Sequence, residues 1–200
     1  MTAIVLASNN PGKLRELSAL LAPLGFAPRP QSELGVGEAE EPHETFLENA
    51  LAKARHAARA TGLAAIADDS GLCVPALGGA PGVHSAHYAG SDGDRDQRDA
   101  RNNAKLVAAL RGERARAAYY YCVLVLLRSP ADPTPVVADA RWHGEILERP
   151  RGSGGFGYDP HFLLPAIGLT AAELDPREKN RVSHRGQALA LLAERLARAG

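Results

Sequence analysis

The chain of 200 residues is 45% hydrophobic, which is enough to bury a core in one compact domain. Its 23 basic and 23 acidic residues cancel, so no net charge favours binding to nucleic acid or to an anionic membrane surface. No apolar run approaches the roughly 18 to 20 residues that a membrane helix needs and no signal pattern follows Met1, so we expect a cytoplasmic protein with a small-molecule partner.

A strand is predicted over residues 2–7, and a helix follows it. Asn10 and Pro11 are typical of a helix cap and a first helical residue, and Gly25 is placed to end the helix. The segment between strand and helix, Ser8-Asn9-Asn10-Pro11-Gly12-Lys13, combines free backbone N–H groups, the positive end of the helix dipole and an ammonium group. These features predict a phosphate site, although Ser and Asn before a helix are also ordinary caps. The segment is not a Walker A loop, which has a longer glycine-rich turn.

A second helix is predicted from a capping pair, Thr45 with Glu48, to Gly62. Lys53 lies on the same face of this helix as Asn49, four residues earlier. An ammonium and an amide therefore project together from one side of the helix.

Two adjacent carboxylates, Asp68 and Asp69, follow a strand predicted at residues 64–67. They would lie at the carboxyl end of the strand, where ligands gather in α/β sheets. Because side chains alternate, one carboxylate can face a site while the other anchors the turn. With a ligand from the acidic cluster at residues 38–41, such a carboxylate could hold Mg²⁺ or accept a proton from water. An Asx turn beside a solvated acidic loop is the alternative.

The middle of the chain predicts a loop, a helix and a hairpin. Residues 75–93 are rich in glycine and form the loop, and residues 94–110 predict a surface helix whose polar side is expected to be solvated. Residues 117–127 are nearly all apolar or aromatic and residues 136–147 alternate, which predicts two strands joined by a long loop.

The last part of the chain predicts further helix. Thr170 and Glu173 have the spacing of a capping box, and leucines recur at helical spacing over residues 189–196. Together with the elements before them, these patterns predict a mixed α/β architecture.

Two rare residue types are informative. The two cysteines lie in separate apolar runs without metal-ligand spacing, so we expect buried free thiols. Only four of the 23 basic residues are lysines, at Lys13, Lys53, Lys105 and Lys179. In an arginine-rich chain these lysines indicate places that need a compact point charge, and we expect Lys105 to be the exception on the surface.

A glycine-rich segment runs from Gly152 to Pro160. It matches G-x-G-x-x-G, but Pro150 precedes the match and Tyr158-Asp159-Pro160 follows it, so no strand enters and no helix opens, and a dinucleotide fingerprint is excluded. Phe156 is placed to stack on a planar base, while Asp159 fixes a turn or a ligand hydroxyl. A core aromatic beside a tight turn is the alternative.

A second polar segment opens the last predicted helix. Ser183 is expected to cap the helix, which places two side-chain donors, His184 and Arg185, at its start. As isolated residues they would more often belong to the surface than to a site.

In this order the segments resemble the inosine/xanthosine triphosphate pyrophosphatase family, nearly from end to end. The resemblance rests on Ser8 to Lys13, Thr45-Phe46-Leu47-Glu48-Asn49-Ala50, Lys53-Ala54, Ala67 to Leu72, Gly79 to Val83, Ser85-Ala86, Gly154 to Pro160, Lys179 and Ser183 to Gln187. Ser8 stands where the family often has threonine, which keeps the hydroxyl.

The resemblance implies an elongated central mixed β-sheet flanked by helices, with two lobes around an active-site cleft in a single domain over residues 1–200. It also implies a homodimer and Mg²⁺-dependent hydrolysis of ITP, dITP and XTP to the monophosphate and pyrophosphate, which removes deaminated purines from the nucleotide pool. A purine nucleoside triphosphate is then the partner, with no role for nucleic acid or a membrane.

The resemblance also assigns roles by motif. Asp69 is the general base and a metal ligand, and the pair Glu40 and Glu41 supplies a further metal carboxylate. The residues expected to bind substrate are Ser8, Asn9, Asn10, Pro11, Gly12, Lys13, Lys53, Ser70, Phe156, Gly157, Tyr158, Asp159, Lys179, His184 and Arg185. Among these, the first loop and the three lysines would hold the triphosphate, while the segments Phe156 to Asp159 and His184-Arg185 would hold the base.

Hypoxanthine and xanthine carry an O6 acceptor where adenine carries an amino donor, so donors aimed at O6 would reject ATP by about 1 to 3 kcal/mol for each mismatched group. GTP also has an O6 and must be excluded through its 2-amino group. Two other activities fit the same motifs less well: a Maf-like pyrophosphatase acting on pyrimidine or modified nucleotides, and a nucleotide sensor without turnover.

Overall fold

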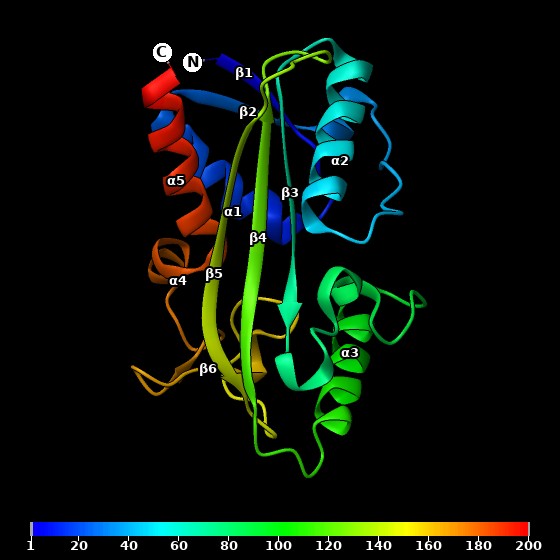
Figure 1. Ribbon diagram of the computed structural model, residues 1–200, viewed down its shortest axis with the longest axis vertical. Helices are drawn as coiled ribbons and strands as arrows, with labels where there is room; N and C mark the ends of the chain where they lie inside the picture. The colour runs from blue at the N-terminus through cyan, green and yellow to red at the C-terminus, as the bar shows by residue number, and fades with distance from the viewer. Residues whose placement is uncertain (1, 200) are drawn as a thin grey trace. The chain divides into compact units, whose positions relative to one another are not determined.

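The computed structural model describes residues 2–199 and contains a seven-stranded sheet with the order β2-β1-β3-β4-β5-β6-β7 (Figure 1). The strands are β1 (Thr2–Leu6), β2 (Phe26–Pro30), β3 (Ala65–Cys73), β4 (Ala117–Leu127), β5 (Val136–Ile146), β6 (Phe162–Leu164) and β7 (Leu169–Thr170). The helices are α1 (Pro11–Leu21), α2 (Phe46–Thr61), α3 (Arg95–Ala109), α4 (Pro176–Val182) and α5 (His184–Ala199). β1 is parallel to β2 and β3, whereas β6 is antiparallel to β5 and β7. The mixed sheet flanked by helices is therefore confirmed.

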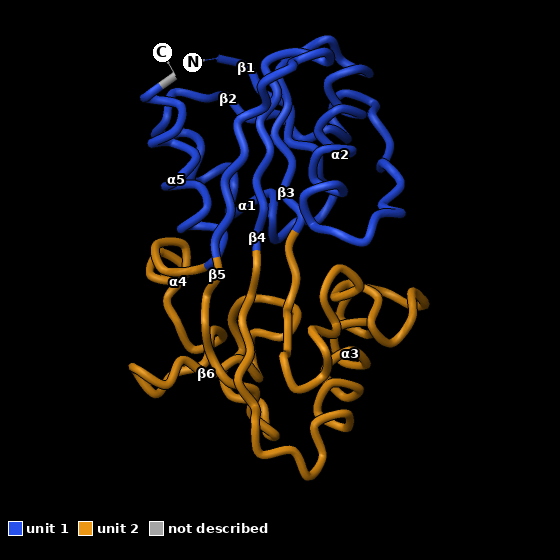
Figure 2. The backbone as a smooth tube through the Cα atoms, viewed as in Figure 1, with its two compact units in different colours: residues 1–69, 122–140, 184–200 blue, residues 70–121, 141–183 orange. Residues whose placement is uncertain are grey.

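The chain divides into two compact units, each built from separated segments (Figure 2). Unit 1 comprises the chain up to Asp69, Cys122–Ala140 and the residues from His184 onward. Unit 2 comprises Ser70–Tyr121 and Arg141–Ser183. The unit boundaries fall within β3 and at residues of β4 and β5, so each of these strands contributes residues to both units.

Unit 1 has α1 and α5 on one face of its strands and α2 on the other (Figure 1). Ile4, Leu6 and Ile66 pack with leucines of α1 and α5 in one buried cluster. Because side chains alternate along a strand, Val5 and Ala67 point to the opposite face, where buried alanines of α2 lie. Both faces of these strands are therefore buried from solvent, as in a parallel sheet covered by helices.

Unit 2 has an aromatic core. The rings of Tyr120 and Trp142 both lie against Phe162, at centroid distances of 4.6 and 5.3 Å, and Phe162 is completely buried. Leu72 and Leu106 extend the cluster to β3 and α3. Burying such large rings supplies much of the hydrophobic stabilisation of this unit.

The predicted helix ends of the first half of the chain are confirmed. The Asn10 side chain accepts hydrogen bonds at the start of α1, and Gly25 closes the turn that follows α1 in a left-handed conformation. The Thr45 hydroxyl oxygen accepts the Glu48 backbone N–H at 3.2 Å, and Gly62 ends α2. Local side-chain chemistry therefore fixes these boundaries, as the sequence predicts.

Two predicted boundaries are wrong. The strand predicted to stop at Ala67 continues to Cys73, so the carboxylates Asp68 and Asp69 lie in the middle of β3 and not after its end. No helix begins at Thr170: Glu173 accepts the Thr170 backbone N–H at 2.7 Å within a turn, and the next helix starts at Pro176.

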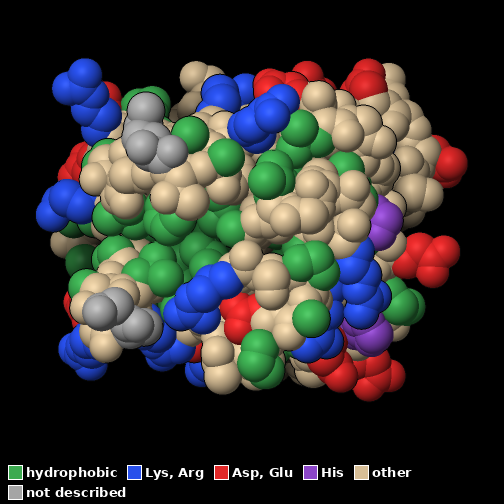
Figure 3. All heavy atoms as spheres, turned by 90° about the horizontal axis from the view of Figure 1, so that it is seen from above, with side chains coloured by type: hydrophobic (Ala, Val, Ile, Leu, Met, Phe, Trp, Pro, Cys, Tyr) green, Lys and Arg blue, Asp and Glu red, His purple; other side chains and the backbone are tan. Residues whose placement is uncertain are grey.

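The expectation of buried free thiols is confirmed. Both cysteines are buried free thiols, and burial raises the pKa of Cys122 to about 12. Among residues 2–199, no helix has both the length and the apolar character needed to cross a membrane. Figure 3 shows lysine and arginine side chains scattered over one end of the molecule, without one continuous basic patch.

Candidate active site

Asp68 and Asp69 point to opposite faces of β3, because consecutive strand residues alternate. Asp68 shares the face of Ile66 and meets cations from α1 and α5. Asp69 shares the face of α2 and meets Lys53. The sequence prediction of two carboxylates with two different tasks is consistent with this arrangement.

The Asp68 carboxylate is completely buried and held by two cations. Its Oδ2 atom lies 3.0 Å from Lys13 Nζ and 3.1 Å from Arg185 Nη2. Arg185 also pairs with Glu16 of α1. Burial by itself would raise the pKa of Asp68, but Lys13, Arg185 and Lys53 together hold it well below its ordinary range. Asp68 is therefore a permanent anion that fixes the Lys13 ammonium.

The Asp69 carboxylate lies between α2 and the segment that precedes it. Its Oδ1 atom accepts from Lys53 Nζ at 3.1 Å, and its Oδ2 atom accepts from Asn49 Nδ2 at 3.4 Å. Lys53 Nζ also reaches Glu41 Oε2 at 3.0 Å, so one ammonium joins two carboxylates. The predicted Asn49 and Lys53 face of α2 thus converges on Asp69.

Burial gives Asp69 a different acidity from Asp68. Desolvation raises the pKa of Asp69 above the ordinary value and Glu41 adds to the rise, against the opposing charges of Lys53 and Lys13. Burial would lower the pKa of Lys53, but the carboxylates around it raise it, so Lys53 remains a cation. A carboxylate with raised pKa beside a fixed cation is typical of a catalytic position.

The first loop lies at the N-terminus of α1, as predicted. Asn10 Oδ1 accepts the backbone N–H groups of Gly12 and Lys13 at 3.0 and 3.1 Å, so these two donors already have a partner. Ser8 Oγ accepts the Asn10 N–H at 3.2 Å, and Asn9 Oδ1 accepts from Gln31 at 3.3 Å. An anion at this loop would meet the helix dipole and the Lys13 ammonium, with the amides of Gly12 and Lys13 already occupied by the cap.

Two carboxylates, Glu41 and Asp69, contact the same ammonium group, that of Lys53. Glu40 and Glu41 are both exposed, but among the described residues only Glu41 forms an ion pair with Lys53, the partner of Asp69. Within residues 2–199 no group of three or more His, Cys, Asp and Glu side chains is arranged around one point. A pair of carboxylates suits Mg²⁺, which takes one or two of them and fills its other positions with water and phosphate oxygens.

Unit 2 holds a second polar cluster, around Phe156. The Lys179 ammonium lies 4.8 Å from the centre of the Phe156 ring, and the Arg95 guanidinium lies 4.7 Å from it. Lys179 Nζ donates to Asp159 Oδ2 at 2.6 Å, and both residues are buried. The ring is therefore held among cations and is not part of the aromatic core.

Asp159 organises this cluster. Besides Lys179 it accepts the Phe156 backbone N–H at 2.8 Å and the Tyr120 hydroxyl at 3.2 Å. Gly155 has φ of +70°, and a Cβ atom there would come within 2.0 Å of Asp159 Oδ2. Only glycine can let the chain pass this close to the carboxylate.

The other residues predicted to bind substrate are distributed over both units. Lys179, expected at the triphosphate, belongs to the Phe156 cluster, while His184 and Arg185, expected at the base, lie buried in unit 1. Ser70 is half-buried in β3. The Tyr158 hydroxyl is directed into unit 2, where it donates to Ser85 O at 2.8 Å.

Four residues of unit 2 with close contacts to the predicted site are absent from the sequence prediction: Arg95, Asp99, Asn103 and Tyr120. The first three recur every four residues along α3, which was expected to present a solvated polar side. A polar stripe with this spacing on a surface helix was the signal available in the sequence.

The chain matches the model of the Ham1 family over residues 4–195. A protein from Ralstonia nicotianae named dITP/XTP pyrophosphatase is 65% identical, over 98% of this chain and 97% of that protein. A protein of the same name from Nitrosomonas europaea is 63% identical, over 98% of this chain and 95% of that protein. The solved structure of a HAM1 protein from Coxiella burnetii has a TM-score of 0.89 and 48% identity, and covers 99% of this chain and 100% of that chain. The resemblance found in the motifs is confirmed, and the chain belongs to the Ham1 family.

Proposed function

We propose that the protein is a nucleoside triphosphate pyrophosphatase that hydrolyses ITP, dITP and XTP to the monophosphate and pyrophosphate. The names of its relatives from Ralstonia nicotianae and Nitrosomonas europaea support this substrate class. The observation that carries the proposal is the environment of Asp69, a buried carboxylate of raised pKa that is held by Lys53 and faces Glu41. This combination suits hydrolysis of a phosphoanhydride bond by activated water, with pyrophosphate as the leaving group.

In this proposal the triphosphate is bound at the N-terminus of α1. Lys13 supplies the charge, and its pairing with Asp68 fixes the position of the ammonium before substrate arrives. Lys53 lies beside the reacting carboxylate and neutralises charge there. Phosphoryl chemistry depends mostly on such positioning and neutralisation, because the protein does little covalent work.

Mg²⁺ is the proposed cofactor, with Asp69 and Glu41 as its protein ligands. The two carboxylates are joined by Lys53, so the acidic groups are already gathered at one place. When bound, the ion neutralises phosphate charge and increases the acidity of water. Glu41 is preferred over Glu40 because, of the two glutamates, Glu41 forms an ion pair with Lys53 in the described part of the chain.

Asp69 is the proposed general base. Its raised pKa makes the carboxylate a better proton acceptor than an ordinary aspartate. Asn49 and Lys53 hold its two oxygens, so the carboxylate has a defined orientation. It would accept a proton from the water that attacks the α-phosphorus.

The Phe156 cluster is the proposed site of the purine base. The Phe156 ring offers a surface for stacking, and the Lys179 ammonium beside it supplies a donor toward an O6 acceptor. His184 and Arg185 were also expected to contact the base. Arg185 is 1% exposed and bonded to Asp68, so we now assign it to holding that carboxylate.

A substrate panel tests the proposal. Purified protein with Mg²⁺ is incubated with ITP, dITP, XTP, ATP, GTP and TTP, and pyrophosphate and orthophosphate are assayed separately. Monophosphate and pyrophosphate from ITP, dITP and XTP alone are expected. Orthophosphate release or a preference for TTP would point to another activity, and binding without turnover would indicate a sensor. Light scattering of the same sample tests the homodimer that the family resemblance implies.

A further inference from the structure

A stripe of polar side chains on α3 contacts the segment that carries Phe156. Arg95, Asp99 and Asn103 are spaced four residues apart and therefore share one face of the helix. All three are half-buried, whereas their neighbour Asp96 is exposed. The stripe is thus covered by another part of unit 2, the segment that contains Phe156 and Gly157.

Asp99 and Asn103 hold both backbone groups of one residue, Gly157. Asp99 Oδ2 accepts the Gly157 N–H at 2.9 Å, and Asn103 Nδ2 donates to Gly157 O at 2.9 Å. Gly157 has φ of +63°, a left-handed conformation that glycine adopts without strain. Fixing both its N–H and its carbonyl sets the direction in which the chain leaves Phe156.

The orientation of the Asn103 amide is determined by its partners. Its nitrogen donates to two carbonyl oxygens, Asp99 O and Gly157 O, both at 2.9 Å, and a carbonyl can only accept. Its Oδ1 atom is buried and has no hydrogen-bond partner within residues 2–199. The contribution of the Asn103 amide at this position is therefore its two N–H donors, and its buried oxygen is left without a hydrogen bond.

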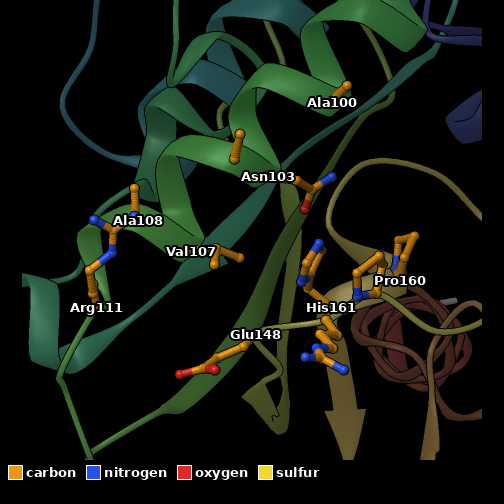
Figure 4. A pocket seen from close by; sticks show the side chains of 11 residues that line it. Ala100, Asn103, Val107, Ala108, Arg111, Glu148, Pro160 and His161 are labelled. Atoms are coloured by element: carbon orange, nitrogen blue, oxygen red, sulfur yellow. The ribbon is translucent and has the colours of Figure 1, made fainter.

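An open pocket of about 670 Å³ lies beside α3 and is lined by residues of this helix, by Arg111 and by residues 148–150, 160 and 161. Asn103 lies at the edge of this pocket and points toward the segment of Pro160 and His161, as Figure 4 shows. On this open side of the helix, the Asn103 amide joins α3 to the segment through its hydrogen bond to Gly157 O.

The third member of the stripe acts on the ring itself. Arg95 covers Phe156 at 4.7 Å from the ring centre and lies 3.8 Å from Asp99. A guanidinium plane stacks on aromatic rings and on purine bases in the same way. Arg95 is therefore placed either to extend a stack of ring and base or to be displaced by the base.

We propose that Asp99 and Asn103 are positioning residues for base recognition: they hold Gly157 so that Phe156 and the donors beside it have the geometry that selects the purine. This inference rests on the proposed function, which assigns the base to the Phe156 cluster. It predicts that loosening Gly157 impairs binding and selectivity more than the chemical step.

The test compares Asp99→Ala with Asp99→Asn and with Asp96→Ala. Asp99→Ala removes the acceptor for the Gly157 N–H and should raise KM for ITP by roughly tenfold, lower kcat much less and narrow the ratio of kcat/KM between ITP and ATP. Asp99→Asn keeps an acceptor oxygen and should restore KM to within about threefold of the wild type. Asp96→Ala, on the exposed side of the same helix, should leave both parameters unchanged.

The variant Asn103→Asp tests the same role independently, through the hydrogen bond to the Gly157 carbonyl. It places a carboxylate against two carbonyl oxygens and should reproduce the Asp99→Ala effect in a side chain of nearly the same shape. Thermal unfolding first establishes that the variants are folded. If folded Asp99→Ala and Asn103→Asp then have the same KM for ITP as Asp96→Ala and the wild type, and the same ratio of kcat/KM for ITP over ATP, the proposal is overturned.

Hydrogen exchange separates this proposal from the proposed function. The Gly157 amide should exchange faster in Asp99→Ala than in the wild type or in Asp96→Ala, whether or not ITP is the substrate. Unchanged exchange would refute the positioning role. Faster exchange in a protein that does not hydrolyse ITP would keep the positioning role for the segment and reject the proposed function instead.

Discussion

The Asp69 carboxylate carries the proposed chemistry, and it can be changed almost without changing its shape. Asp69→Asn removes the basic oxygen but keeps a hydrogen-bonding side chain beside Lys53 and Asn49. We expect kcat for ITP to fall by about a hundredfold or more, the range of general base catalysis. Nucleotide binding measured without metal should change little, because the triphosphate contacts assigned to α1 remain.

The acid limb of the activity profile gives a second check on Asp69. Because burial raises its pKa, the base becomes protonated at a higher pH than an ordinary aspartate as the solution is acidified. The wild-type kcat should therefore decline on the acid side at a higher pH than an ordinary aspartate, with a pKa of about 3.9, would give. Near-normal turnover in Asp69→Asn, or residual activity in it with the same acid limb, would contradict the assigned role.

Arg185 has a stability role that can be measured apart from activity. It is 1% exposed and pairs with Asp68, which is itself 1% exposed, and with Glu16. Arg185→Met leaves a buried carboxylate with one cation fewer, and we expect the free energy of unfolding in urea to fall by about 3 to 5 kcal/mol. Arg198→Ala breaks an exposed pair on the same helix and should change it little, which makes it the matched control.

The pH dependence of that loss follows from Asp68. Its pKa is held well below the ordinary range, so its pairing stabilises the native state above the pKa of an unfolded aspartate and loses this contribution as pH falls toward the folded value. The stability difference between wild type and Arg185→Met should thus be full at pH 7 and shrink on acidification below about pH 4. A difference that grows in acid would contradict the account.

At the level of single elements, the start of α1 couples folding to binding. Asn10→Ala removes the cap that accepts the Gly12 and Lys13 amides and should cost about 1 kcal/mol of stability. Thr45→Ala removes the corresponding cap of α2 and should cost a similar amount, with no effect on the first loop. Only Asn10→Ala should also raise KM for ITP, because the loop assigned to the phosphates loses its shape. If Asn10→Ala and Thr45→Ala have equal KM values for ITP, the Asn10 cap does not contribute to nucleotide binding.

Elements set by local chemistry could be predicted from the sequence, and β3 shows where such prediction ends. Consecutive aspartates followed by Ser70 and Gly71 have low strand propensity, so the strand was predicted to stop before them. The observed strand continues because Asp68 is neutralised by cations from α1 and α5, and one of them, Arg185, lies 117 residues away. Partners at that separation leave no local pattern.

At Thr170 the local pattern predicts a helix start that is not observed, and in α3 the local pattern predicts the helix but not the partner of its polar side. Thr170 and Glu173 have the spacing of a capping box and make half of its hydrogen bonds, but Pro176 and its cap Asp175 start the helix instead. In α3 the helix was predicted correctly and only the function of its polar side was missed. Local spacing predicts the element, whereas the partner that covers a face depends on tertiary contacts.

For the whole molecule, the sequence predicts the mixed sheet and, through the family resemblance, the candidate residues, but not how those residues are grouped. Asp68, Lys13 and Arg185 belong to one compact unit, and Phe156, Asp159 and Lys179 belong to the other. Neither unit is a continuous piece of chain: unit 1 needs three segments and unit 2 needs two. The spacing of these residues along the sequence therefore does not predict which of them lie in the same unit.

The same division leads to a prediction about cooperativity. Since each unit is assembled from separated segments and β3, β4 and β5 contribute to both, we expect residues 1–200 to unfold as a single domain. Calorimetry should show one transition with equal calorimetric and van't Hoff enthalpies. Arg185→Met in unit 1 and Phe162→Leu in the core of unit 2 should each lower the same Tm, because each weakens one cooperative structure. Two transitions, with each variant lowering only one of them, would mean that the units are separate domains.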